Sequence, residues 1–407
     1  MKRTTKSGQN MIRKSWFITG LICSLFLALV AVGLSFFAGL RPELQHCMAN
    51  GKSQPVPITD LEESIHHALM KYEGGKPLYQ RYSPDQSIHI ADNLLLWQNH
   101  DGGWPKNVDW LKILTKDDLD AMPSFKKSKS AGSTLDNKNI WAQIDFLVQV
   151  RSKTRLKRYD NTINRAIDYL IDNQHLSGGW RGADVDAITF NDDVMTGVIR
   201  TLKQVTDDDA LYGFVSTSRR ESAQQAYKKG IGCILKCQIR TNGKLTAWAQ
   251  QHDHKTFRPV KGRRYEFSFP VTRESVSIVT LLMEIDRPDR KIIQAIESAV
   301  NWLNTVKIEG LLIREVPADP IQYRYHWTDF DRVEVHEQGA PPIWARFYDP
   351  KHKKPAFANR EKQIVWRYQD LTRERRTGYE WYGYWPARLL QREYPAWRNK
   401  INRANHE

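Results

Sequence analysis

Apolar side chains recur every three or four residues along most of the chain after residue 60. This spacing places them on one face of a helix, and few stretches show the alternation that a half-buried strand requires. The segments with helical spacing are residues 61–70, 139–150, 161–174, 222–238, 275–285 and 291–306. The pattern therefore predicts a mostly α-helical domain.

A weak internal repeat connects these segments. Residues 94–104 (LLLWQNHDGGW) and 170–180 (LIDNQHLSGGW) each contain a helix end, a glutamine, a glycine turn and a tryptophan. Residues 235–248 contain a modified form of this unit, and residues 302–312 match it more weakly. The tryptophans are 76 and 68 residues apart, which suits one pair of helices per repeat. We expect an incomplete α/α toroid of helical hairpins. Its helices would end at glycines with positive φ, and its turns would form a groove on one face.

The segment at residues 16–40 carries no charge and is long enough to cross a hydrocarbon layer of about 30 Å as a helix. Five basic residues and no acidic ones precede it. The positive-inside rule then predicts a cytoplasmic tail at 1–15, a transmembrane signal-anchor at 16–40, a linker at 41–60 and a periplasmic or extracellular domain at 61–400. A cleaved signal peptide and a buried helix of a soluble protein are the alternatives.

Composition and charge narrow the range of partners. Of 407 residues, 41% are hydrophobic and 11% aromatic, which excludes a disordered chain. The formal net charge is +15, and residues 41–407 alone carry +10. A basic exported domain suits an acidic polysaccharide, nucleic acid or anionic lipid, although solubility explains the charge equally well. Because no DNA-binding or RNA-binding motif is visible, we expect no nucleic-acid partner.

Oxygen-bearing side chains gather before two of the predicted helices. Asp136 and Asn137 form the first group, and Asp192 lies in the second, ITFNDDVM at residues 188–195. One such residue often serves only as an N-cap, but the three acceptors in NDD exceed what one cap needs. Oxygen ligands suit a hard cation such as calcium. EF-hand spacing is lacking, so a calcium site would have to be assembled from distant segments.

Two further regions are rich in basic and aromatic side chains. Residues 248–267 (WAQQHDHKTFRPVKGRRYEF) predict a surface loop, and loops on rigid scaffolds often hold function. Residues 344–350 and 372–385 mix arginine with aromatics, which suits sugars, because sugar rings stack on aromatic faces and guanidinium groups bind carboxylates. His252 and His254 do not match zinc spacing, and no Walker, Rossmann, GxSxG or HExxH motif is visible.

Together these motifs resemble the pectate lyases of polysaccharide lyase family ten. The similarity runs over most of residues 61–390 and includes QNHDGGWPKN, the DN pair, NQHLSGGW, ITFND, AWAQQHDHKTFRPVKGRRYE, WARFYD and RRTGYEWYG. Each motif alone is weak, but their order and spacing are fairly specific. The resemblance implies an α-helical toroid-like domain and an enzyme that cleaves a polygalacturonate-like glycan by calcium-assisted β-elimination.

The resemblance also implies roles for individual residues. Asp136 matches the aspartate of the family's DN motif and Asp192 that of its FND motif, and both would help to hold the calcium. Arg263 matches the arginine of the R-x-Y-E motif, which the family uses as catalytic base. An arginine pKa above about 12 makes this role demanding, so Arg263 would need a nearby calcium and a desolvated position. The residues expected to bind substrate are Lys106, Asn137, Arg258 and Arg346.

The sequence departs from the family at a few positions and leaves two alternatives open. Lys138 and Trp141 are bulky where the family has small residues, so we expect them to fill part of the groove, and the loop before ITFND is short. The first alternative is a catalytically impaired module of the same fold that binds acidic glycans. The second is a terpene-cyclase-like α/α protein, but Asp184-Val185-Asp186 lacks the further acid that its proton donor requires.

Overall fold

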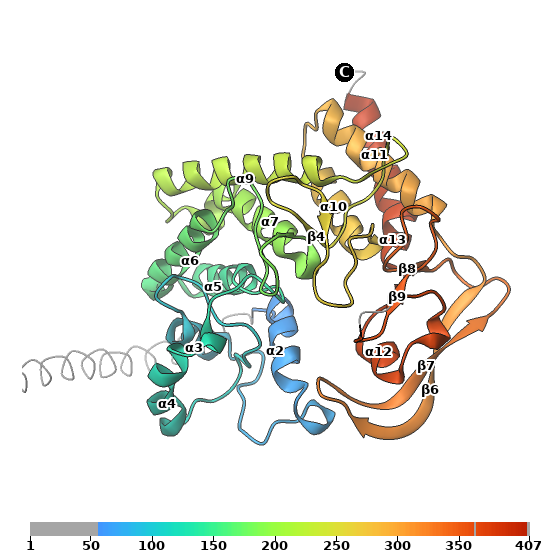
Figure 1. Cartoon of the computed structure of the whole chain (residues 1–407). Helices are drawn as coiled ribbons and strands as arrows, with labels where there is room; N and C mark the ends of the chain where they lie inside the picture. The colour runs from blue at the N-terminus through green and yellow to red at the C-terminus, as the bar shows by residue number, and fades with distance from the viewer. Residues whose placement is uncertain (1–55, 362–363, 405–407) are drawn as a thin grey trace, which may run out of the picture. The chain divides into compact units, whose positions relative to one another are not determined.

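Helices form most of the domain in this computed structural model, which describes residues 56–361 and 364–404 (Figure 1). All six segments predicted to be helical lie in helices. The α-helices are α2 (Glu62–Leu69), α3 (Ser87–Trp97), α4 (Lys116–Lys126), α5 (Trp141–Thr154), α6 (Asp160–Asp172), α7 (Val194–Asp207), α8 (Asp209–Tyr212), α9 (Thr217–Cys237), α10 (Thr272–Met283), α11 (Arg290–Thr305), α12 (Arg373–Gly378), α13 (Trp385–Arg388) and α14 (Tyr394–Ala404).

Five small antiparallel sheets accompany these helices within the described residues, and the sequence pattern did not predict them. The largest is a hairpin of β6 (Leu311–Gln322) and β7 (Trp327–His336), with a register shift between Pro317 and Ile321. Most of its side chains are exposed or half-buried, so no buried face marks it in the sequence. The short strands are β1 (Ile188–Thr189), β2 (Arg240–Thr241), β3 (Lys244–Leu245), β4 (Gln251–His252), β5 (Pro259–Val260), β8 (Trp344–Ala345), β9 (Phe357–Ala358), β10 (Ile364–Val365) and β11 (Tyr382–Gly383).

The predicted fold class, a mostly helical toroid preceded by a transmembrane helix, is therefore wrong as stated. The domain is helical with several sheets. No helix within residues 56–361 and 364–404 is long and apolar enough to span a membrane. The segments predicted as tail (1–15) and transmembrane span (16–40), with most of the linker (41–60), lie outside the described residues.

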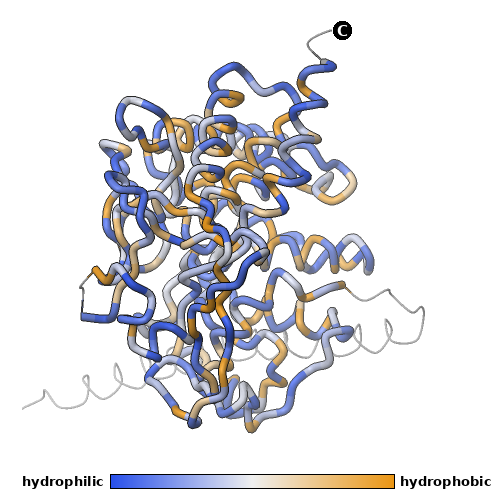
Figure 2. The backbone as a smooth tube through the Cα atoms, turned by 90° about the vertical axis from the view of Figure 1, so that its right-hand side faces the viewer, coloured by the Kyte–Doolittle hydropathy of each residue, from blue (hydrophilic) through white to orange (hydrophobic). Residues whose placement is uncertain are grey.

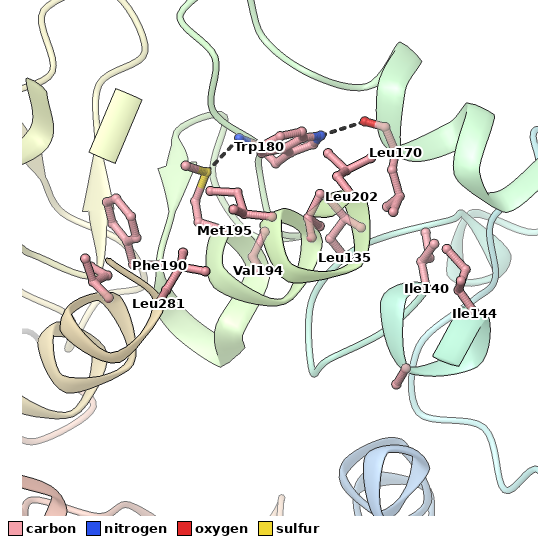
Figure 3. Packing of buried hydrophobic residues seen from close by; sticks show 14 of the residues in the cluster. Leu135, Ile140, Ile144, Leu170, Trp180, Phe190, Val194, Met195, Leu202 and Leu281 are labelled. Carbon is pink, nitrogen blue, oxygen red and sulfur yellow. Dashed lines mark hydrogen bonds between the residues drawn. The ribbon is translucent and has the colours of Figure 1, made fainter. Parts of the chain in front are cut away.

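The sequence repeat corresponds to a tryptophan that hydrogen-bonds the helix before it. In each case the indole N–H donates to a carbonyl in the last turn of that helix, where the helix leaves carbonyls unpaired. Figure 3 shows this bond for Trp180, whose ring is fully buried. The pairs are Trp104 with Leu94 (2.8 Å), Trp180 with Leu170 (2.7 Å), Trp248 with Ile234 (2.8 Å) and Trp344 with Leu303 (2.8 Å). The fourth tryptophan lies well beyond residues 302–312, because the β6–β7 hairpin is inserted between α11 and Trp344.

A glutamine after each of the first three repeat helices links one repeat to the next. Its amide nitrogen donates one hydrogen bond to a carbonyl of its own turn and a second to a carbonyl inside the next repeat helix. The sets are Gln98 with Gly102 and Thr162 of α6, Gln174 with Gly178 and Ala226 of α9, and Gln238 with Thr246 and Ala295 of α11, all at 2.8–3.0 Å. The helices α3, α6, α9 and α11 are therefore joined in sequence by one repeated polar contact.

Glycine is required in the first two turns by both conformation and space. Gly102 and Gly178 have φ of +91° and +93°, which confirms the prediction of positive φ. A Cβ at either position would clash with a backbone carbonyl of the next repeat helix, that of Arg165 or Lys229. The helices end several residues earlier, at Trp97 and Asp172. The glycines thus shape the turn and do not cap the helix, which corrects the predicted position of the helix ends.

The buried apolar residues form two clusters. The main one lies among the repeat helices and includes the repeat tryptophans, and Figure 2 shows hydrophobic positions recurring along the helices. A smaller aromatic cluster gathers Phe267, Phe347, Phe357 and Trp381, beside the short strands near the C-terminus. The candidate site is built from segments that contact both clusters, so its backbone has packed support on two sides.

We predict that Gln174→Ala lowers the free energy of unfolding by roughly 1–3 kcal/mol. The substitution removes the two hydrogen bonds to the carbonyls of Gly178 and Ala226, and each such bond contributes about 0.5–1.5 kcal/mol. Chemical denaturation of the full-length protein measures the change. Gln204→Ala, at an exposed position of α7, is the control and should change it by less than about 0.5 kcal/mol. Equal effects of the two substitutions would contradict a linking role for Gln174.

Candidate active site

A small sheet brings together the segments that carry Asp192 and Arg263. Strand β1 pairs with β4, Ile188 opposite His252, and β4 pairs with β5. Beyond β1 the contact continues, because Phe190 N donates to the carbonyl of Gln250 at 2.8 Å. The ITFND segment and the loop at 248–267 are therefore held side by side, although they lie about sixty residues apart in the sequence.

The residue two positions after each repeat tryptophan lies at this site. These residues are Lys106, Gly182, Gln250 and Arg346. Lys106 pairs with Asp136, and a Cβ at Gly182 would lie 3.7 Å from Asp136 Oδ1. Gln250 and Arg346 both donate to the side-chain oxygen of Asn191, next to Asp192. The repeat therefore supplies one site position per unit.

Asp136 is buried, and its carboxylate forms an ion pair with the ammonium group of Lys106. The neighbouring Asn137 donates from Nδ2 to Asn107 Oδ1 at 2.7 Å. Asn139 holds this segment against the first repeat turn, because its Nδ2 donates to the carbonyl of Trp104 at 2.7 Å. The structure thus places two of the predicted substrate-binding residues, Lys106 and Asn137, beside the predicted metal ligand Asp136.

Asp192 lies in the 3-10 helix η5 (Asn191–Asp193), immediately before α7. Its Oδ2 accepts a hydrogen bond from Asn191 Nδ2 at 2.7 Å. Burial raises the pKa of Asp192 to about 7, and the negative charge of Asp136 adds to this rise. The positive charges of Arg346 and Arg263 act in the opposite direction. The predicted metal ligands and the predicted base therefore lie within electrostatic reach of one another.

A buried ion pair holds the residue that precedes Asp192. The guanidinium of Arg346 pairs with Glu274, and both side chains are at most 5% exposed. Arg346 Nη2 also donates to Asn191 Oδ1 at 3.0 Å, and Gln250 Nε2 donates to Glu274 Oε1 at 2.8 Å. Arg346 was predicted to bind substrate, whereas here it is enclosed and fixes the residue beside Asp192. Arg346 Nε and Glu274 Oε2 are buried without a hydrogen-bond partner.

Arg263 lies in the loop after β5, half-exposed and held by a buried acid. Its Nε and Nη2 both donate to Glu266 Oε1, at 2.8 and 2.5 Å, and its backbone N–H donates to Oε2 at 2.8 Å. Burial lowers the pKa of Arg263, but the charge and hydrogen bonds of Glu266 outweigh burial and raise the pKa above its ordinary value. In this arrangement Arg263 is a fixed cation.

Backbone strain marks both aspartate segments. Asn137, Lys138 and Ile140 have φ of +54°, +59° and +72°, and Asp192 and Asp193 have φ of +54° and +56°. Such left-handed conformations cost roughly 1–3 kcal/mol each for residues other than glycine and cluster at functional sites. The fold maintains this strain on the two segments whose carboxylates approach each other.

Other predicted positions lie elsewhere. Arg258 is exposed at the end of the turn between β4 and β5, just before Pro259 of β5. Trp141 was expected to fill the groove, but its indole packs on Gly197 of α7, where a Cβ would clash with the ring. Lys138 approaches Asp193 at 4.0 Å. The bulky Trp141 is therefore accommodated between helices.

Sequence reasoning missed the acids that hold the two arginines. Glu266 ends the RRYE motif, and its place three residues after Arg263 could have indicated an ion pair. Glu274 lies near the start of a helix with no such signal, because its partner Arg346 is 72 residues away. Long-range pairs of this kind cannot be assigned from spacing.

The site fits a divalent cation held by oxygen. Asp136 and Asp192 repel each other, and partial burial leaves this repulsion poorly screened, which is the situation that a bound cation relieves. Lys106 now partly neutralises Asp136. A cavity of about 340 Å³ adjoins Asp192 and is lined by Arg273, Glu274 and Trp385 among others. The side-chain oxygen of Asn137, whose Nδ2 bonds Asn107, is a further acceptor beside Asp136.

Solved structures with a similar fold were found. One is a mutant of a family 10 polysaccharide lyase from Cellvibrio cellulosa in complex with trigalacturonic acid, 24% identical, covering 83% of this chain and 98% of that one, with a TM-score of 0.61. Another is the family 10 polysaccharide lyase from the same organism, also 24% identical, covering 83% and 97%, with a TM-score of 0.60. At this identity the likeness concerns the fold.

The family assignment comes from the sequence itself. No curated protein matches the chain as a relative. The sequence model of the family described as pectic acid lyase matches residues 98–390, which is most of the chain. The predicted resemblance and the predicted enzyme class are thereby confirmed: the chain belongs to the pectic acid lyase family of polysaccharide lyases.

Proposed function

We propose that the protein cleaves a polygalacturonate-like acidic polysaccharide by β-elimination, at the site that contains Asp136, Asp192 and Arg263. The main support is the half-buried Asp192, whose pKa is raised to about 7 by burial and by Asp136, among the charges of Arg346 and Arg263. Perturbed groups of this kind are typical of catalytic sites. The complex of the related structure with trigalacturonic acid supports the substrate class.

The reaction requires removal of the proton on carbon 5 of a uronate, next to a carboxylate. Removing it adds negative charge to an anionic group, so the transition state needs positive charge nearby. When bound, calcium would supply that charge through Asp136 and Asp192. The electron pair left on carbon 5 then forms the double bond between carbons 4 and 5 as the bond from carbon 4 to the glycosidic oxygen breaks. That oxygen takes up a proton, and the sugar ring that lost its C5 proton becomes the unsaturated product.

The residues of the chain have separable tasks in this scheme. Asp136 and Asp192 hold the cation, and the Arg346–Glu274 pair keeps the segment of Asp192 in place. Lys106 and Asn137 lie beside Asp136, where a uronate carboxylate or hydroxyl can be bound. Arg263 takes the proton from carbon 5 only if it is neutral, so it must first be released from Glu266. Its side chain is 38% exposed, which allows this movement.

One observation favours the second candidate function, a glycan-binding module without activity. The ion pair with Glu266 keeps Arg263 charged, and a charged guanidinium can bind a uronate but cannot accept its proton. The two functions share the substrate and differ only in whether product forms.

We predict that the full-length protein releases unsaturated product from polygalacturonate with calcium and not with a chelator. Arg263→Ala should reduce the initial rate by roughly a thousandfold, as loss of a general base does. Asp192→Asn should raise the calcium concentration that gives half-maximal rate. Near-ultraviolet absorbance of the unsaturated product measures the rate, and alginate serves as the second uronate polymer.

Arg264→Ala is the matched control, because Arg264 is the exposed neighbour of Arg263, and its rate should stay within about threefold of the wild type. A wild type that binds polygalacturonate and forms no product would establish the binding-module function instead. Full activity in Arg263→Ala would exclude Arg263 as the base.

A second prediction concerns pH. Removing the charge of Glu266 removes an interaction that favours the protonated form of Arg263, so Glu266→Gln should lower the pKa of Arg263. If Arg263 is the base, the rise of rate with pH should then begin about one pH unit or more lower than in the wild type. The pH dependence of initial rates at saturating calcium measures this. An unchanged profile in Glu266→Gln would argue that Arg263 does not titrate during the reaction.

A further inference from the structure

Two histidines and an aspartate from three separate segments meet outside the site described above. His175 lies in the turn after α6, Asp186 in the loop before β1, and His254 in the loop after β4. One ligand atom of each lies within 4.8 Å of the other two. His175 Nε2 is 3.7 Å from Asp186 Oδ1, and the two imidazole rings stack with centroids 4.7 Å apart.

One ring nitrogen of each histidine in this cluster lacks a hydrogen-bond partner. His175 Nε2 and His254 Nδ1 are buried atoms with no hydrogen bond. An unpaired buried polar atom costs free energy, so native structures usually satisfy such atoms. His252, two residues before His254, shows the usual pattern: its Nδ1 faces the carbonyl of Phe257 at 2.8 Å, and its Nε2 accepts from Ala249 N at 3.0 Å.

The first repeat shows what the residue equivalent to His175 does in its own turn. It follows Gln174 as Asn99 follows Gln98, so the two residues are equivalent in the first two turns. Asn99 Nδ2 donates to the carbonyl of Ala131 at 2.7 Å and to Ser133 Oγ at 3.0 Å. In the first repeat this side chain therefore joins the turn to the segment that leads to Asp136. In the second repeat an imidazole holds the same place, facing Asp186 and His254.

We propose that His175, Asp186 and His254 form a transition-metal site, best suited to Zn²⁺, that joins the loop at 181–187 to the turn between β4 and β5. Two imidazoles and one carboxylate are a frequent zinc ligand set and leave a fourth position for water. Calcium, which prefers oxygen ligands, is disfavoured here. The site goes beyond the proposed function and is distinct from the aspartate pair.

The geometry needs only a small adjustment. Ligand atoms of a tetrahedral zinc site lie about 3.4 Å apart, close to the 3.7 Å between His175 and Asp186. The rings are nearly parallel, at 7°, so His254 must tilt toward the carboxylate for both nitrogens to point at one ion. Asp186 is 60% exposed on its side chain, which leaves an entry path for the ion.

This metal link would act on the position of Arg263. Asp184, two residues before Asp186, lies 3.7 Å from Arg263 Nε. Fixing Asp186 against His254 therefore restrains the acidic loop beside the proposed base. We assign the metal a positioning role, since none of its three ligands lies among the residues around Asp192.

The test measures zinc binding to the full-length protein after treatment with a chelator, and isothermal titration calorimetry is the method. The wild type should bind one equivalent of Zn²⁺ at this site, and Co²⁺ in its place should give the intense visible absorption of a tetrahedral complex. A hundredfold excess of Zn²⁺ over Kd should raise Tm by roughly 4 °C. His175→Asn, which installs the residue of the first turn, and His254→Gln should each weaken binding by roughly a hundredfold.

Three further variants make the outcome decisive. His352→Gln removes an exposed histidine that also contacts an aspartate, Asp349, and should bind zinc like the wild type. Asp186→Asn changes an exposed side chain and tests the site even if a histidine variant folds poorly. Asp192→Asn should leave zinc binding intact. Wild-type protein without saturable zinc binding would overturn the proposal, as would undiminished binding in His175→Asn and Asp186→Asn or a loss confined to Asp192→Asn.

Discussion

The fold depends on a glutamine amide that donates two hydrogen bonds in different directions. In each of three turns, one bond closes the glutamine's own turn and the other reaches a carbonyl inside the next repeat helix. A carbonyl inside a helix already accepts one backbone bond, so the glutamine uses its second lone pair. The contact therefore fixes the separation and the rotation of neighbouring helices without disturbing either. The tryptophan that follows packs in the main apolar cluster beside the same turn.

This junction explains why catalytic candidates come from distant parts of the sequence. Lys106 and Gln250 each follow a repeat tryptophan whose turn contains this glutamine contact. Arg346 follows Trp344, whose turn is held to α11 by the indole bond to Leu303. The charges at the site are then balanced in pairs: Lys106 with Asp136, Arg346 with Glu274, and Arg263 with Glu266. Asp192 is the carboxylate among them whose nearest hydrogen-bond donor is an uncharged amide. It is therefore the carboxylate with the greatest need of a cation.

Much of the fold could be predicted, because its strongest signals are local. The spacing of apolar residues located six helices, and the Gln-Gly-Trp order located the turns. The hairpin β6–β7 could not be found in this way: it has little buried face, and Pro317 and Pro320 interrupt its pattern. At the site, Asp136, Asp192 and Arg263 came from motifs and do approach one another. Glu266 lies three residues after Arg263, so its pairing has a local signal. The pairing of Glu274 with Arg346 and the approach of His175 to His254 depend on packing between distant segments. The burial of Arg346 follows from the same packing, so spacing along the chain does not reveal it.

The turn glycines have a consequence for how the repeats are joined. At Gly102 and Gly178 a backbone carbonyl of the neighbouring helix occupies the place of a side chain, so no other residue fits at either glycine without separating two repeats. The positions two residues after each tryptophan are lysine, glycine, glutamine and arginine, so the repeat presents a different side chain from each unit. One backbone frame thereby brings four different chemical groups to a single place.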